Sequence, residues 1–167
     1  MATDQYAAPL IASGKLIPAI NSADGSKLKV LTATYAKTAA DNDTSILRLW
    51  KSVDPNLIPI YGGYAGAAIA GLTSVSLGVY RAGGAALAAA CFMSAVNLAA
   101  GFASTNPKTA QDTLTAVALA DQGQKRVFEF AGHNINTRQG EYDIAATLTT
   151  AGTNTGQMTW FLVVAQG

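Results

Sequence analysis

The side chains that could carry out chemistry are few in this sequence. His133 is its one histidine and Cys91 its one cysteine. A hydrolase or transferase that works through a nucleophile needs a base beside it and a third group that orients the base. A zinc site usually needs several histidine or cysteine ligands. One residue of each type favours neither chemistry. We expect Cys91 to be a small buried apolar residue and His133 to bond a terminal carbonyl at the end of a helix.

Two acidic groups remain as candidate sites. Asp41, Asn42 and Asp43 offer oxygen ligands for calcium, but a calcium loop needs further ligands and a glutamate at a set spacing, so we expect a solvated turn. Glu141 and Asp143 lie two residues apart, hence on one face of a strand, whereas glycosidase carboxylates face each other across a cleft. We expect both carboxylates to lie on a solvent-exposed face of the strand. The sequence thus predicts a protein that is not an enzyme, with no catalytic residue, no cofactor and no metal site.

The composition points to a subunit of an assembly. Hydrophobic residues make up 50% of the chain and charged residues 13%, the latter about half the usual share. Such a surface is poorly protected against association. The net charge is +1 and Lys125-Arg126 is the one adjacent basic pair, so nucleic-acid binding is not expected. The first residues lack a basic stretch followed by an apolar core, so no signal peptide is expected.

The elements that would position these residues are strands. In Thr73–Tyr80 apolar residues occupy every second position, which places them on one face of a strand. Arg81–Gly84 contains two glycines and is typical of a tight turn. Ala85–Phe92 is expected to return as the second strand of this hairpin.

Strand patterns recur at intervals of roughly ten residues along the rest of the chain. Leu47 and Leu49 are expected to face one side of their strand, and Arg48 and Trp50 the other. The last two segments are expected to pair as a hairpin. With one short helix among so many strands, the sequence predicts a mainly β domain, an antiparallel β-sandwich or jelly roll. The further segments with strand patterns are Lys27–Lys37, Thr44–Val53, Leu57–Tyr61, Glu141–Thr150 and Gln157–Ala165.

The short helix is expected over about residues 120–131, with Asp121 as its cap and Gly132 as its C-terminal stop. Met1–Ser13 is too short and too polar at its start to bury much surface alone, so we expect an extended N-terminal arm that orders against the domain or a partner. Residues 14–167 are expected to form one domain, because 167 residues can bury a single core.

An alternative interpretation of the apolar centre is a membrane hairpin. Gly62–Tyr80 and Ala85–Ala103 are uncharged and nearly long enough to span a bilayer. Small residues dominate both segments, which lowers the hydrophobic driving force, and the alternation near Thr73–Tyr80 has no purpose in a lipid-facing helix. We therefore favour strands and expect no membrane association.

The succession of four segments resembles a known family of proteins. These are LRLWKSVDPNLIPI, SVSLGVYRAGG, LADQGQKRVFEFAGH and EYDIAATLTTAGTNTGQMTWFLVV, within residues 27–167. In this order they resemble the capsid decoration, or cement, proteins of tailed bacteriophages. The resemblance implies a jelly-roll or sandwich subunit, commonly trimeric, that binds the outside of the head and clamps neighbouring capsomers.

The resemblance also implies partners and a location. The main partner would be the major capsid protein, and the protein would be made in the host cytoplasm and carried on the capsid surface of the virion. Tyr6, Pro9 and Leu10 in the arm are the expected contact residues. The alternatives are a tail or fibre subunit of the virion and, less favoured, the membrane hairpin.

Overall fold

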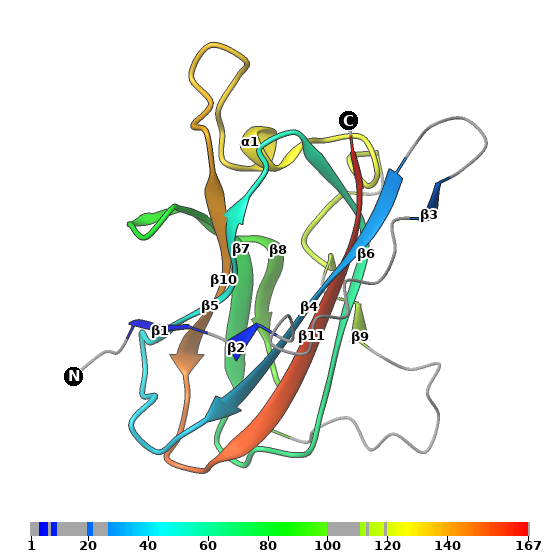
Figure 1. The fold of residues 1–167 in the computed structure, drawn as a ribbon. Helices are drawn as coiled ribbons and strands as arrows, with labels where there is room; N and C mark the ends of the chain where they lie inside the picture. Colours follow the sequence, from blue (N-terminus) through cyan, green and yellow to red (C-terminus); the bar gives the residue numbers. More distant parts are fainter. Residues whose placement is uncertain are drawn as a thin grey trace.

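The computed structural model of the protein describes residues 4–6, 8–9, 20–21, 27–99, 111–112, 114–118 and 120–166. Two β-sheets form separate layers (Figure 1). Sheet A has the strand order β1-β5-β10-β7-β8, and sheet B has the order β2-β4-β11-β6-β9, with β3 also pairing with β4. The strands are β1 (Asp4–Tyr6), β2 (Ala8–Pro9), β3 (Ile20–Asn21), β4 (Lys27–Lys37), β5 (Ile46–Val53), β6 (Leu57–Gly66), β7 (Ser74–Arg81), β8 (Ala86–Val96), β9 (Gln111–Asp112), β10 (Tyr142–Thr150) and β11 (Gly156–Gln166), and the helix is α1 (Val127–Phe130).

The strand pairing is that of a jelly roll. Strand β4 pairs with β11, β5 with β10, β6 with β9 and β7 with β8, all antiparallel. These nested pairs are those of one long hairpin that has been rolled up, so that successive pairs fall in opposite sheets. The result is two four-stranded sheets, β5-β10-β7-β8 and β4-β11-β6-β9, which is the double-sheet arrangement of a jelly roll. The prediction of a mainly β sandwich or jelly roll is confirmed.

The core lies between the two sheets. Leu77 and Ile144 from sheet A and Trp160 and Leu162 from sheet B are fully buried. The Trp160 ring packs against Tyr64 on β6, with ring centroids 5.1 Å apart. Each such side chain contributes about 1.5–3 kcal/mol through its removal from water. The alternation of apolar residues thus marks the side of β7, β10 and β11 that faces the opposite sheet.

The central hairpin is confirmed. Strand β7 pairs with β8, and the turn is closed by bonds from the Arg81 N–H to the Ala85 carbonyl at 3.0 Å and from the Gly84 N–H to the Arg81 carbonyl at 2.9 Å. Gly83 has a φ of 62°, which glycine adopts without strain. The apolar centre of the chain therefore forms strands.

No helix in the described ranges is long and apolar enough to cross a membrane. In place of the alternative helical hairpin, Gly62–Gly66 ends β6, and β7 and β8 follow as strands.

The expected C-terminal hairpin is wrong. Strand β10 pairs with β5 and β7 in sheet A, whereas β11 pairs with β4 and β6 in sheet B. The connection at residues 151–155 therefore crosses from one sheet to the other. Both strands carry apolar residues on one face because those faces meet across the core, and period-two alternation does not distinguish this arrangement from pairing within one sheet.

The helix is shorter than expected. It spans Val127–Phe130, and residues 121–124 form turns. Asp121 does not cap it; its carboxylate pairs with Lys125 at 2.9 Å. The backbone N–H of Arg126 donates instead to the Glu129 carboxylate at 2.7 Å, which begins the helix one turn later. The C-terminal stop at Gly132 is confirmed by its φ of 76°.

Candidate functional site

Two of the expected arm contacts lie on edge strands. Tyr6 ends β1, which runs parallel to β5 with Tyr6 opposite Arg48. Pro9 lies in β2, which runs antiparallel to β4 with Pro9 opposite Ala33. Proline suits an edge strand because it has no N–H to donate to a further neighbour. Leu10 lies outside the described residues. The arm strands thus extend both sheets at their β4–β5 edge, and the roles of Tyr6, Pro9 and Leu10 as contact residues stay predictions.

An apolar groove of about 440 Å³ lies at the same edge, between β4 and β5. Its lining includes the apolar side chains of Leu31, Leu49 and Trp50 and the charged side chains of Lys29 and Lys51. The indole N–H of Trp50 is buried and has no hydrogen-bond partner among the described residues. This edge therefore combines short added strands with apolar surface.

Trp50 reaches the core side because β5 is irregular. Arg48 pairs with Ala145 and Trp50 with Ile144, so the register shifts by one residue at Leu49. All of residues 47–50 are buried. The expected alternation, with Arg48 and Trp50 on one side, is wrong because this bulge turns Trp50 to the side of Ile144.

The outer face of sheet B is apolar or neutral along three strands. On β11, Met158, Trp160, Leu162 and Val164 are buried toward the core, so the residues between them face outward. Residues opposite these in the register of β4 and β6 share that outward face. None of them carries a charge at neutral pH. We call this surface the sheet B outer face; it consists of Leu28, Val30, Thr32, Thr34 and Ala36 on β4, Gln157, Thr159, Phe161, Val163 and Ala165 on β11, and Ile58, Tyr61, Gly63 and Ala65 on β6.

The side chains of the sheet B outer face contact one another. The rings of Tyr61 and Phe161 lie 5.6 Å apart, and Tyr61 is 45% exposed. The hydroxyl oxygens of Thr34 and Thr159 are hydrogen-bonded at 3.2 Å. Because these hydroxyls bond each other, the free-energy cost of removing them from water is lower than it is for unpaired hydroxyls. An extended apolar surface of this kind is unusual on a soluble monomer.

The outer side of sheet A is different because the chain covers part of it. Every residue from Val75 to Tyr80 on β7 is buried, including those that face away from sheet B. A methyl group at Gly78 would overlap the backbone of Ala88 and Ala89, so β8 lies directly against this strand. The sheet B outer face therefore has no equivalent on sheet A.

A buried ion pair holds the tip of the β7–β8 hairpin against sheet A. Arg48 and Asp143 are each 1% exposed, and the Arg48 Nη1 lies 2.9 Å from the Asp143 Oδ2. The Arg48 Nη2 donates to the carbonyl of Gly84 at 2.7 Å, and the Gly83 N–H donates to Asp143 at 2.9 Å. The Ser52 N–H donates to the second oxygen of Asp143 at 3.1 Å.

This network corrects the expectation for Glu141 and Asp143. Glu141 is exposed, but Asp143 is buried and fully used in structural bonds. The expectation that both carboxylates lie on a solvated strand face is wrong. Arg48 on the neighbouring strand neutralises Asp143, and the tip of the hairpin excludes water from it.

The expected solvated turn at residues 41–43 is also wrong in part. Asp41 is fully buried and accepts bonds from the Thr38 N–H at 2.7 Å and the Thr38 hydroxyl at 3.0 Å. Lys37 is buried beside it and donates to the carbonyls of Gly152 at 3.0 Å and Asn154 at 2.9 Å. Burial lowers the pKa of Lys37, and the negative charge of Asp41 opposes that shift. These groups hold two loops together and are not arranged as an open cation site.

His133 follows the helix as expected, but its ring does not bond the helix carbonyls. The backbone N–H of His133 donates to the Phe128 carbonyl at 3.0 Å. The ring Nδ1 lies 2.7 Å from the hydroxyl of Tyr142, which also accepts a bond from the Gln139 N–H at 2.8 Å. The histidine thus joins the loop after the helix to the start of β10.

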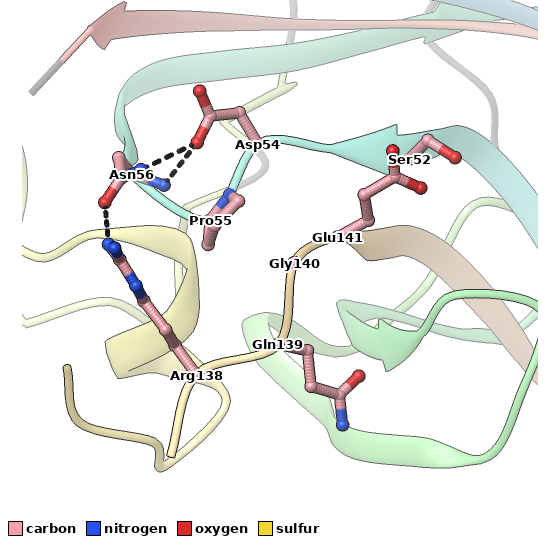
Figure 2. A pocket seen from close by; sticks show the side chains of 8 residues that line it. All are labelled: Ser52, Asp54, Pro55, Asn56, Arg138, Gln139, Gly140 and Glu141. Atoms are coloured by element: carbon pink, nitrogen blue, oxygen red, sulfur yellow. Dashed lines mark hydrogen bonds between the residues drawn. The ribbon is translucent and has the colours of Figure 1, made fainter. Parts of the chain in front are cut away.

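A polar pocket of about 510 Å³ lies between the end of β5 and the loop before β10 (Figure 2). On one wall the Asp54 carboxylate accepts bonds from the backbone and side-chain N–H groups of Asn56 at 2.8 and 3.0 Å, and Arg138 donates to the Asn56 amide oxygen. Glu141 and Ser52 lie on the opposite wall. The lining has no histidine or cysteine. It offers hydrogen-bonding groups from several side chains.

Within the ranges that the structure describes, no three His, Cys, Asp or Glu residues lie close enough together to hold a metal ion.

Cys91 is half-buried on β8 and packs against the core. Burial raises the pKa of its thiol from 9.0 to about 12. At pH 8 the thiolate fraction falls from about one in ten to about one in ten thousand, and only the thiolate reacts with alkylating agents. We expect Cys91 to react with iodoacetamide about a thousandfold more slowly in the native protein than in guanidinium chloride at the same pH. Mass spectrometry of timed samples measures both rates, and equal rates would contradict the burial of this thiol.

Comparisons with known proteins add one finding about the fold. No protein-family model matches the sequence, and none of the curated proteins searched matches it. Among solved structures, the chain is similar to one described as "Cyanophage Pam1 capsid asymmetric unit", with a TM-score of 0.53 and 15% sequence identity. The match covers 93% of this chain and 96% of that chain. The two chains share a fold over nearly their whole lengths.

Proposed function

We propose that the protein is a non-enzymatic structural component of a tailed-phage capsid, where it binds the outside of the shell and stabilises contacts between capsomers. The observation that carries this proposal is the shared fold with a capsid chain over 93% of this chain. Because one fold can serve many functions, the surface must also suit the role.

The surface of the protein suits close packing against other proteins. Charged residues make up only 13% of the chain, and charged residues are depleted at the centres of protein interfaces. The β4–β5 edge offers short added strands and an apolar groove, to which a segment of another chain can add. The partner in this proposal is the major capsid protein, with neither nucleic acid nor membrane involved, and the location is the capsid surface of the virion.

Several copies would act together. Three copies around one axis is the arrangement that the resemblance to decoration proteins favours, and it is part of this proposal. Copies bound at symmetric sites add their contacts, so a modest affinity for each site becomes strong attachment to the shell.

Binding to phage heads tests the proposal. Purified protein should sediment with expanded heads that lack it and raise the temperature at which the heads rupture, as followed by dye access to packaged DNA. Protein found only in the tail fraction of virions would contradict the capsid role and favour a tail or fibre subunit.

The arm provides a sharper variant. Removal of Met1–Ser13 is expected to weaken head binding at least tenfold, because it removes the proposed contact residues Tyr6, Pro9 and Leu10. The far-ultraviolet spectrum should keep its β character, since β1 and β2 only border the sheets. Unchanged binding by the shortened protein would remove the arm from the proposed interface.

A further inference from the structure

The strongest unassigned feature of the protein is the sheet B outer face. It spans three neighbouring strands, and β4 and β11 stay in register from Leu28–Ala165 to Lys37–Gly156. Tyr61 at 45% exposure lies beside the half-buried Phe161, and neither is covered by a charged neighbour on this face. Most residues of this face are half-buried and Tyr61 is exposed, and an exposed apolar patch of this kind favours contact with another protein surface.

We propose that the sheet B outer face packs against the same face of a second copy of this chain, across a two-fold axis. This pairing does not depend on the proposed capsid role. In a two-fold contact each copy uses the same patch, so the patch must be compatible with itself.

The charge distribution favours a second copy as the occupant. A partner with charged groups would have to bury them against a surface that offers no opposite charge, which is costly. An identical face brings no charge and leaves none unpaired. The bonded hydroxyl pair of Thr34 and Thr159 can also be buried without losing its hydrogen bond.

The size of the face sets the strength of the contact. Three strands about 4.8 Å apart and ten residues long, with a rise of about 3.4 Å per residue, cover roughly 14 by 34 Å, or about 480 Å² on each copy. Two such faces bury about 960 Å² if each is treated as flat, without the additional area of protruding side chains. This area is close to the lower limit of about 1,000 Å² for a specific interface. We therefore expect a weak dimer in free solution that becomes fully formed where copies are concentrated.

Analytical ultracentrifugation of the full-length chain tests the pairing. The wild-type protein should self-associate as its concentration rises to the millimolar range, with even numbers of copies, either dimers or pairs of trimers. The variant Phe161→Lys places a charge at the centre of the face and should raise the dissociation constant of this association at least tenfold. The control is Ile135→Lys, which changes an apolar residue that is 60% exposed and outside the face; it should associate like the wild type.

The outcomes that overturn the inference are distinct from those that overturn the capsid role. A wild-type protein that stays monomeric, or forms only an isolated trimer, contradicts the two-fold pairing. Equal loss of association in both variants contradicts it as well. If the wild type is monomeric and Phe161→Lys abolishes head binding, the face binds the shell and not a second copy. Thermal unfolding of both variants shows whether a lost association reflects loss of the fold.

Discussion

Replacement of Asp143 by alanine is expected to lower the free energy of unfolding by about 3–5 kcal/mol. Asp143 accepts bonds from Arg48, Ser52 and Gly83 while it is 1% exposed. Its removal leaves the Arg48 guanidinium buried without its counter-charge and two backbone N–H groups without their acceptor. The hairpin tip that covers sheet A should loosen as well. Urea unfolding followed by tryptophan fluorescence measures the change.

Glu141→Ala is the matched control for this variant. Glu141 lies two residues before Asp143 but is exposed, so its loss should change the free energy of unfolding by less than about 0.5 kcal/mol. A double variant, Arg48→Met with Asp143→Leu, should recover much of the lost stability, because it removes both buried charges. A loss below about 1 kcal/mol for Asp143→Ala alone would mean that the ion pair is not the tie that holds the hairpin.

Gly78→Ala is expected to destabilise the protein by about 3 kcal/mol or more. A methyl group at Gly78 would overlap the carbonyl oxygen of Ala88 and the backbone of Ala89. Backbone atoms cannot move aside as a flexible side chain can, so β7 and β8 must separate. The control is Gly140→Ala, where an added methyl group would meet nothing within 4 Å. Similar melting temperatures for the two variants would show that β8 does not lie against β7 as described.

The existence of the strands could be predicted from the sequence, but their partners could not. Apolar residues at every second position identify β7, β10 and β11 and the side of each that faces the core. The same pattern arises whether two consecutive strands pair in one sheet or face each other across the core. This explains why the β7–β8 hairpin was predicted correctly, while β10 and β11 were wrongly expected to pair.

The burial of Asp143 and Lys37 could not be predicted because each depends on residues far along the chain. Asp143 is 95 residues from Arg48 in the sequence, and Lys37 donates to a carbonyl 117 residues away. An isolated acidic residue in an alternating strand is typical of a solvent-facing position, so Asp143 was expected at the surface. Only the rolled arrangement of the two sheets brings their partners to them.

The sheet B outer face could have been found from the sequence with the correct strand partners. In Gln157–Ala165 the residues between the buried positions are Gln, Thr, Phe, Val and Ala, none of them charged. In Lys27–Lys37, Lys29 and Lys37 lie on the opposite face of the strand from the outward-facing Thr32 and Thr34. The outer face is recognised by the absence of charged residues at its positions. These positions can be grouped into one face only when the register between β4 and β11 is known.

The measurement that tests the proposed role most directly is cryo-electron microscopy of expanded phage heads incubated with the purified protein. We predict density for a two-sheet jelly roll on the outer surface of the shell, at repeated sites where capsomers meet. Heads that remain bare at saturating protein, or density confined to the tail, would contradict the proposed role.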